Sequence, residues 1–251
     1  MTRKLMAGKW AFLAAIICAF RALAAPVLAQ GIGTDRVGAL AAPQAASKEF
    51  TEDFSLYEVD LASRGRNPFF ILEPGYRLLL GNEDTRLIIT VLNKTKTIKG
   101  VTTRVVEERE FLNGVLIERS LNYFAISRRN NSVFYFGEDV DIFTPGEPVS
   151  HEGAWLAGVN GAREGLIMPG IALLGARYAQ EIAPDVALDR AEIVGVDQTR
   201  QVPAGLFRRV IETLETTPLE PGHKESTWYA PGVGLIQDAD VVLLRFGFVQ
   251  L

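Results

Sequence analysis

The stretch Val101–Ser127, VTTRVVEEREFLNGVLIERSLNYFAIS, decides the fold class of this chain. Two runs rich in β-branched and apolar residues flank Asn113-Gly114, the residue pair that favours a two-residue type I′ turn in a β-hairpin. A two-residue loop fixes the strand register, so Leu112 is expected to lie opposite Val115. The stretch therefore predicts a pair of long antiparallel strands.

The charged residues of this hairpin support the same register. Counting back from the turn, Arg109 is expected opposite Glu118, and Glu108 opposite Arg119. Opposite charges facing each other across two strands stabilise the pair by about 0.2–1 kcal/mol, whereas like charges destabilise it. A slip by one residue would place Glu108 opposite Glu118, so the charges favour the register that the turn predicts.

Strand signals also dominate the rest of the chain. Thr85–Asn93 is dense in β-branched and apolar residues, and Val202-Pro203-Ala204-Gly205 is typical of a hairpin turn. No region shows a long apolar period of 3.6 residues. We therefore expect a mainly β fold, with a single antiparallel sheet that is curved or forms a half-open β roll. A long Gly-rich loop is expected over Gly137–Gly175.

Residues 1–29 have the three parts of a secretory signal peptide, which are a basic start, an apolar run and small residues at a cleavage site. Arg21 interrupts the apolar run before it reaches the roughly 20 residues that a membrane-spanning helix needs. Cleavage is expected after Ala29, with Ala24 and Ala25 as alternatives. The protein is therefore expected to be periplasmic or secreted.

The leader is followed by two further parts. Residues 30–66 begin with Ala, Gly, Gln and Ser, and we interpret them as a mobile linker with a short helix near residues 47–56. Residues 67–251 are expected to form one antiparallel β domain. No other long apolar run follows, so no integral membrane segment is expected after cleavage. The sequence does not indicate the oligomeric state.

Charge and cysteine content exclude several classes of function. Removing the leader takes away four basic residues and no acid, so the formal net charge changes from −4 to −8. A net acidic surface disfavours nucleic acid as a partner. The only cysteine, Cys18, lies in the leader, so the exported chain has no disulfide, no catalytic thiol and no thiolate metal ligand. No cofactor is indicated.

Several longer motifs occur together between Asn67 and Leu251. They are NPFF-x-LEPG (Asn67–Gly75), SVFYFGED (Ser132–Asp139), EGAWLAGVNGAREGLIMPG (Glu152–Gly170), QVPAGLF (Gln201–Phe207), TPLEPG (Thr217–Gly222) and WYAPGVGL (Trp228–Leu235). In this order the chain resembles a group of exported, uncharacterised bacterial β-rich proteins. Members of that group often carry Asp-Trp-Tyr where this chain has Asn122-Tyr123-Phe124.

The resemblance implies a β-rich exported protein but no activity. The VPAG turn followed by the YAPGVG turn is also similar to the curved antiparallel half-barrels of the envelope lipoprotein-carrier type. This second likeness concerns the fold alone, and a fold does not establish a function.

Familiar catalytic motifs are absent from the sequence. His151 and His223 are the only histidines, without the spacing of a zinc site, and no serine-hydrolase motif is present. The glycines of Tyr229–Gly234 lack the strand-before, helix-after context of a phosphate-binding loop and predict a turn. The catalytic residues, if the protein is an enzyme, are unknown, and no metal site is predicted.

The Gly137–Gly175 region and the strand before it supply the candidate ligand-binding residues, since long loops on a β scaffold often carry function. They are Tyr135, His151, Trp155 and Arg163. Aromatic rings supply apolar walls, and a guanidinium is suited to an anionic group. The alternative is that the loop only covers one opening of the sheet and that Trp155 plugs the core.

Two functions are compatible with the sequence. The first, which we favour, is a non-enzymatic envelope protein that binds an apolar or polysaccharide-like ligand in its curved sheet. The alternative is a carboxylate-dependent, glycosidase-like hydrolase that uses Glu and Asp side chains near His151. Glu138, Asp139 and Asp141 form an acidic group, which we interpret as solvated loop acids.

Overall fold

The structure, a computed structural model, describes residues 49–144 and 147–251. The predicted signal peptide and residues 30–48 of the predicted linker lie outside the described residues. The described part is mainly β and holds no α-helix, only the 3-10 turn η1 (Glu58–Asp60). This confirms the predicted fold class, although residues 49–56 do not form the expected short helix.

Fifteen of the described strands form one sheet, in which all pairings are antiparallel. The long strands are β4 (Tyr76–Gly81), β5 (Thr85–Ile98), β6 (Val101–Leu112), β7 (Val115–Ser127), β8 (Val133–Thr144), β13 (Arg190–Val202), β14 (Gly205–Thr216), β15 (Glu225–Ala230), β16 (Gly234–Asp238) and β17 (Val241–Phe248). The short strands are β1 (Leu61–Ala62), β9 (Glu147–Ser150), β10 (Trp155–Leu156), β11 (Gly165–Met168) and β12 (Arg177–Ala179). A separate hairpin pairs β2 (Gly65–Asn67) with β3 (Phe70–Leu72).

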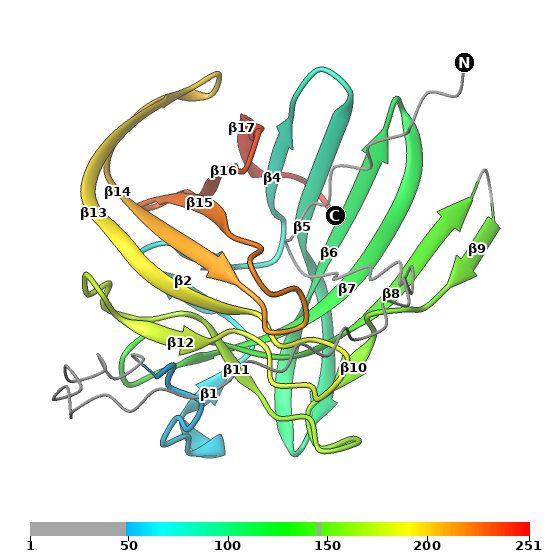
Figure 1. The fold of residues 1–251 in the computed structure, drawn as a ribbon, viewed down its shortest axis with the longest axis vertical. Coiled ribbons are helices and arrows are strands. Elements are labelled where there is room, and N and C mark those ends of the chain that lie inside the picture. Colours follow the sequence, from blue (N-terminus) through cyan, green and yellow to red (C-terminus); the bar gives the residue numbers. More distant parts are fainter. Residues whose placement is uncertain (1–48, 145–146) are drawn as a thin grey trace, which may run out of the picture. The chain divides into compact units, whose positions relative to one another are not determined.

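The sheet consists of two runs of strands, most of them neighbours in the sequence, joined in the middle. The path runs β10-β8-β7-β6-β5-β4 and continues β17-β16-β15-β14-β13-β12. Figure 1 shows β5–β8 (teal and green) and β13–β14 (yellow and orange) on opposite sides, with β4, β17 and β16 between them. The end strands β10 and β12 do not pair with each other, so the sheet is curved but open.

The hairpin between β6 and β7 has the predicted turn but not the predicted charge pairs. Asn113 and Gly114 have φ angles of 52° and 80°, as a type I′ turn requires, and Leu112 lies opposite Val115. A bulge between the pairs at Phe111 and Glu110 then shifts the register by one residue. The prediction of two opposite-charge pairs is therefore wrong.

Beyond the bulge, like charges lie opposite each other, with Glu110 facing Glu118 and Arg109 facing Arg119. The shift changes the face of the sheet to which the Arg119 side chain points, and it allows Arg119 to pair with a carboxylate. In the predicted register Arg119 would share a face with Glu108 and the core, whereas in the observed register it reaches Glu107 on the convex face.

Arg109 and Arg119 of the hairpin therefore form ion pairs with carboxylates on the convex face of the sheet. We call this the outer face of the sheet. The opposite, concave face is the inner face, which carries the core.

Two further local predictions concern turns and the linker. Tyr229–Gly234 forms the turn between β15 and β16, with Ala230 opposite Gly234, as predicted. Contacts with the sheet begin within the stretch assigned to the linker. Thr51 bridges to Tyr178, and the ring of Phe54 lies 5.8 Å from that of Phe134.

Candidate ligand-binding cavity

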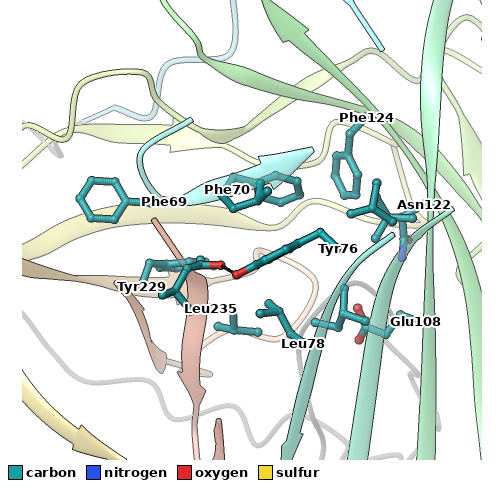
Figure 2. Close-up of a pocket in the computed structure, with 15 residues that line it drawn as sticks. Phe69, Phe70, Tyr76, Leu78, Glu108, Asn122, Phe124, Tyr229 and Leu235 are labelled. Carbon is teal, nitrogen blue, oxygen red and sulfur yellow. Dashed lines mark hydrogen bonds between the residues drawn. The ribbon is translucent and has the colours of Figure 1, made fainter. Parts of the chain in front are cut away.

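The inner face of the sheet holds a cavity of about 50 Å³ between its two runs of strands. In Figure 2, side chains from β3, β4, β6, β7, β15 and β16 point toward the same space. Four aromatic rings dominate it, those of Phe70, Tyr76, Phe124 and Tyr229. We call this space the aromatic cavity, and its other apolar walls are Phe69, Ile71, Leu78, Ile89, Val91, Val106, Val233 and Leu235.

Buried hydroxyl groups hold in place Tyr76, which lines the aromatic cavity, and Tyr135, which packs behind Phe124. The Tyr76 hydroxyl donates a hydrogen bond to the carbonyl oxygen of Val233 (2.8 Å), which ties β4 to the turn before β16. Burial raises the pKa of Tyr76 to about 12, so this hydroxyl remains a neutral donor. The Tyr135 hydroxyl donates to Oδ1 of Asn122 (2.8 Å), and its ring stacks on Phe124 at 4.7 Å.

The turn between β2 and β3 covers the aromatic cavity. Its anchor is Asn67, which is 1% exposed and whose Nδ2 donates to the carbonyl oxygens of Asn131 (2.8 Å) and Pro169 (2.9 Å). The Asn67 Oδ1 accepts a hydrogen bond from the backbone N–H of Phe69 (2.7 Å). Phe69 and Phe70 are only half-buried, so the cover reaches solvent on its other side.

Next to the aromatic cavity, four carboxyl groups face one another across the inner face. Glu108, Glu110 and Glu118 come from β6 and β7, and Asp238 comes from β16. We call them the inner carboxyl cluster. They line a gap of about 10 Å³, which is roughly the space that one water molecule needs. Among the described residues, no basic side chain forms an ion pair with any of the four.

Burial and mutual repulsion keep protons on this cluster. Burial, together with the nearby Glu118 and Glu110, raises the pKa of Glu108 well above its usual range. Burial raises the pKa of Glu110 to about 7, and burial together with Glu110 raises that of Glu118 to about 8. The pKa of Asp238 is also raised, first by burial and then by neighbouring acids that include Glu108. The cluster is therefore largely neutral at mildly acidic pH.

A second row of acids continues from Asp238 toward the other end of the sheet. Glu215 and Glu225 lie directly opposite each other on β14 and β15. Glu225 lies 3.5 Å from Nε2 of His223, and Glu215 accepts a hydrogen bond from Nε2 of Gln180 (3.2 Å). Burial raises the pKa of Glu215 to about 8. This row has an imidazole and an amide as partners, whereas Asp238 of the inner carboxyl cluster accepts a long hydrogen bond from the Thr227 hydroxyl (3.4 Å).

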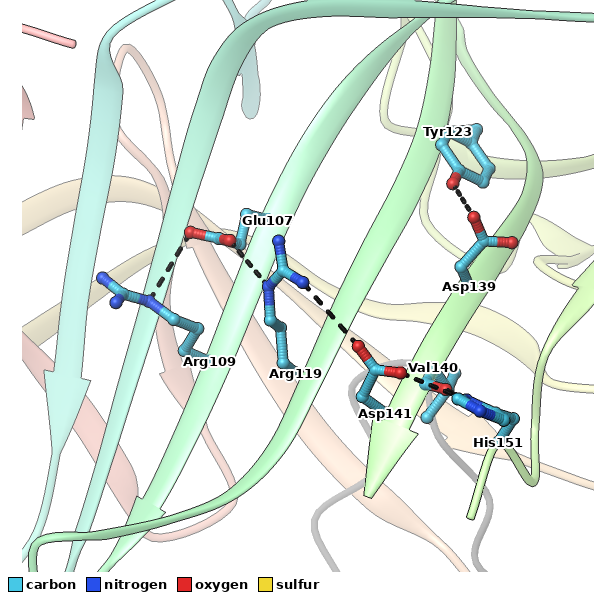
Figure 3. Close-up of polar contacts among 8 residues, drawn as sticks. All are labelled: Glu107, Arg109, Arg119, Tyr123, Asp139, Val140, Asp141 and His151. Atoms are coloured by element: carbon cyan, nitrogen blue, oxygen red, sulfur yellow. Dashed lines mark hydrogen bonds and ion pairs between the residues drawn. The ribbon is translucent and has the colours of Figure 1, made fainter. Parts of the chain in front are cut away.

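The outer face of the same strands carries a different polar arrangement. Figure 3 shows Glu107 between Arg109 and Arg119, with N–O separations of 3.5 and 2.9 Å. Arg119 also approaches Asp141 at 3.7 Å, and Asp141 lies 3.1 Å from Nδ1 of His151. Arg109, Glu107, Arg119 and Asp141 form a chain of alternating charges along the convex surface, and His151 lies at its end.

Two of the four residues singled out from the sequence lie together on the inner face. Tyr135 and Trp155 are 0% and 6% exposed, and their rings meet edge to face at 5.2 Å. Gly137 allows this approach, because a Cβ atom there would lie 2.2 Å from the Trp155 carbonyl oxygen. Burial raises the pKa of the nearby Glu181 well above its usual range, and Trp155 lowers it in part.

The other two residues lie elsewhere. His151 is largely exposed, at 73%, and its Nδ1 faces the carbonyl oxygen of Val140 as well as Asp141 on the outer face. Arg163 forms ion pairs with Asp53 (2.7 Å) and Glu52 (3.6 Å). The structure therefore does not bring His151 or Arg163 to Trp155.

A larger cavity, of about 240 Å³, lies beside Trp155. Glu138 and Asp139 of β8 line it, together with Ala154, Leu156, Val159, Asn160, Ala162, Ala183, Pro184 and Val186. The interpretation of the acidic group as solvated loop acids is wrong, because all three acids lie on β8 and Glu138 is only 1% exposed. Burial, followed by repulsion from Glu181, raises the pKa of Glu138 well above its usual range.

Sequence reasoning missed most of the residues at the centre of the inner face. Phe70 and Tyr229 belong to two of the longer motifs, and Tyr76 directly follows the first of them, but none of the three was assigned to a site. Glu108 and Glu118 were instead expected to pair with Arg119 and Arg109. The signal that could have identified them is the spacing of Glu108 and Glu110, since residues two apart on a strand share a face.

No protein-family model, curated protein or solved structure matches this chain. Within residues 49–144 and 147–251, no group of three or more acids, histidines or cysteines is arranged to hold a metal ion. The same residues include no helix with the length and hydropathy needed to cross a bilayer. The site is therefore interpreted from its own geometry.

Proposed function

We propose that this chain is an exported, non-enzymatic envelope protein that binds an apolar ligand on the inner face of its curved sheet. The observation that carries the proposal is the aromatic cavity, whose lining is apolar apart from Glu108 and Asn122. Ligand sites in proteins are usually concave and apolar, with a few placed polar groups. Between the apolar and polysaccharide-like ligands expected from the sequence, this lining favours the apolar one.

Entry of a ligand requires the β2–β3 turn to move. The aromatic cavity holds only about 50 Å³ while Phe69 and Phe70 cover it, which is room for a short chain. Displacing the turn would break the hydrogen bonds of Asn67 while leaving the main sheet intact, because β2 and β3 pair only with each other. The cover is thus separable from the scaffold.

Native mass spectrometry of the protein purified from the compartment to which it is exported tests the proposal. A co-purifying apolar molecule is expected in the wild type. Replacing Leu78, which lines the cavity, with Phe should fill the space and remove that molecule. The matched control is Leu79→Phe, on the other face of β4, which should retain it. Wild-type protein that carries no apolar molecule would contradict the proposal.

The alternative, a carboxylate-dependent hydrolase, has one observation in its favour. The cavity beside Trp155 is lined by two carboxyls in different environments, since Glu138 is buried while Asp139 accepts hydrogen bonds from Lys96 and Tyr123. Such a contrast is what general acid–base pairs require. The test is hydrolysis of chromogenic glycosides, which should be detectable in the wild type and lost in Glu138→Gln if the alternative holds.

A further inference from the structure

The inner carboxyl cluster and the aromatic cavity share one residue. Glu108 lines both spaces, and Figure 2 shows its side chain at the edge of the aromatic cavity. In the strand ladder it lies between Ile89 on β5 and Ser120 on β7. A bound molecule could therefore place an apolar part on one side of Glu108 and a polar part on the other.

The polar side of Glu108 is a site with unused hydrogen-bond acceptors. Asp238 is 0% exposed and lines the gap, and its Oδ2 has no hydrogen-bond partner among the described residues. The Oε1 atom of Glu110 is buried without a partner as well. Buried acceptors that lack donors cost free energy, so a ligand that donates hydrogen bonds there would be favoured.

Charge and size limit what the polar part can be. Four acids converge without a described basic partner, which selects a cation over an anion. The gap of about 10 Å³ admits a group the size of one water molecule. A primary ammonium has that size and carries three donors, whereas a guanidinium or a trimethylammonium group is larger.

We infer that the inner face binds an amphiphilic primary amine, with its ammonium group in the inner carboxyl cluster and its short alkyl chain in the aromatic cavity. This inference rests on the proposed function and names the class of its ligand. The net negative charge of the chain would also raise the local concentration of a cationic ligand.

Proton release gives the inference a specific signature. Carboxyl groups whose pKa is raised to about 7 and 8, as for Glu110 and Glu118, still hold protons near neutral pH in the free protein. An ammonium among them favours the ionised form, so amine binding should release protons. An alcohol of the same chain length should bind without releasing any.

The test is calorimetric titration of the full chain with hexylamine, hexanol and hexanoate at pH 7 in two buffers of different ionisation enthalpy. Hexylamine should bind at least about tenfold more tightly than hexanol, with a heat that depends on the buffer. Glu108→Gln should remove this preference. Glu107→Gln is the matched control, because it makes the same substitution at the next residue, on the outer face, and should keep the preference.

The outcomes separate the inference from the proposed function. If hexanol binds as tightly as hexylamine, the cavity takes apolar ligands and the inference is overturned. If hexylamine binds equally to Glu108→Gln and wild type, it adsorbs at the surface, and the inference is again overturned. If none of the three compounds binds, both the inference and the proposed function fail. Asp238→Asn, on the other run of strands, serves as a second variant should Glu108→Gln not fold.

Discussion

The two faces of β6 and β7 carry similar numbers of charged residues, but these residues form ion pairs on only one of the two faces. On the outer face, Glu107 lies 2.9 Å from Arg119, and Arg119 continues to Asp141. On the inner face, Glu108 and Glu118 lie among other acids without an ion pair to a described basic residue. The same two strands therefore present a charge-neutralised surface and a proton-dependent one.

The presence or absence of a basic partner distinguishes charged residues that stabilise a sheet from charged residues that are available to a ligand. Partly exposed ion pairs such as Glu107–Arg119 contribute a little stability. Buried acids without cations oppose folding whenever they ionise. The inner face thus carries a local energetic cost that a bound cation would offset, and the following experiments measure that cost against the outer face.

The largest effect is expected where the inner face is packed rather than charged. Trp155→Ala should lower the free energy of unfolding by about 3–5 kcal/mol, because it leaves a cavity next to Tyr135. The control is Leu156→Ala on the same short strand, whose half-buried side chain should contribute less. Urea denaturation measures both. A loss below about 1 kcal/mol for Trp155→Ala would contradict its role as a core residue.

The pH dependence of stability comes next. The pKa of Glu110 rises to about 7 and that of Glu118 to about 8 on folding, so the folded state holds more protons than the unfolded state above about pH 4.5. The stability that these two carboxyl groups contribute is therefore present in full below about pH 4.5, and it is lost as pH rises toward 8. Glu110 alone predicts a loss of about 3 kcal/mol. Urea midpoints that stay constant from pH 5 to pH 8 would refute this.

Removing one acid from the inner face and one from the outer face should change stability in opposite directions. Glu108→Gln is expected to stabilise the protein by about 2 kcal/mol at pH 8 and by much less at pH 5, since the neutral amide avoids ionisation in a buried site. Glu107→Gln on the outer face should instead destabilise the protein slightly at both pH values. The sign of the difference at pH 8 is the measurement. Destabilisation by Glu108→Gln would invert the comparison.

On the outer face, Arg119→Ala should cost about 0.5–1 kcal/mol, because Arg119 bridges Glu107 and Asp141. The effect should shrink at high salt, which screens partly exposed pairs more than buried groups. Thermal unfolding at low and high salt checks this. A salt-independent loss would mean that Arg119 acts through packing rather than charge.

The smallest effect is expected at the exposed end of the outer network. His151 is 73% exposed and reaches Asp141 and the Val140 carbonyl from the surface. His151→Ala should therefore change the free energy of unfolding by less than about 0.5 kcal/mol. It should also leave hexylamine binding unchanged. A loss of hexylamine binding in this variant would show that His151 contributes to the ligand site after all.

The fold class followed from local signals, but the face of each charge did not. Asn113-Gly114 predicted the turn, and the first pair, Leu112 with Val115, is as expected. The bulge beyond it carries no local signal of its own, because it reflects which side chains the core and the partner strand β8 accept. One extra residue reverses the faces of a strand. Without the bulge, the prediction paired Glu118 with Arg109, which lies on the outer face, whereas Glu118 lies on the inner face opposite Glu110.

The site could be predicted only in part for the same reason. Tyr135 and Trp155 were identified as aromatic residues near a glycine-rich loop, and they do meet on the inner face. The aromatic cavity combines Phe70 and Tyr76 with Tyr229, which lies far from both in the sequence. Only the pairing of β4 with β17 brings them together, and such long-range pairing leaves no local pattern.

That pairing also has a consequence for the order of events in folding. The hairpins β4–β8 and β13–β17 can each form from neighbouring residues, but β4 and β17 are separated by most of the described chain. Closing so long a loop is slow, and until it closes each half leaves a strand edge open to other chains. During synthesis β4 must wait for β17, so we expect the joint at the middle of the sheet to form late and its strand edges to be exposed to aggregation until it does.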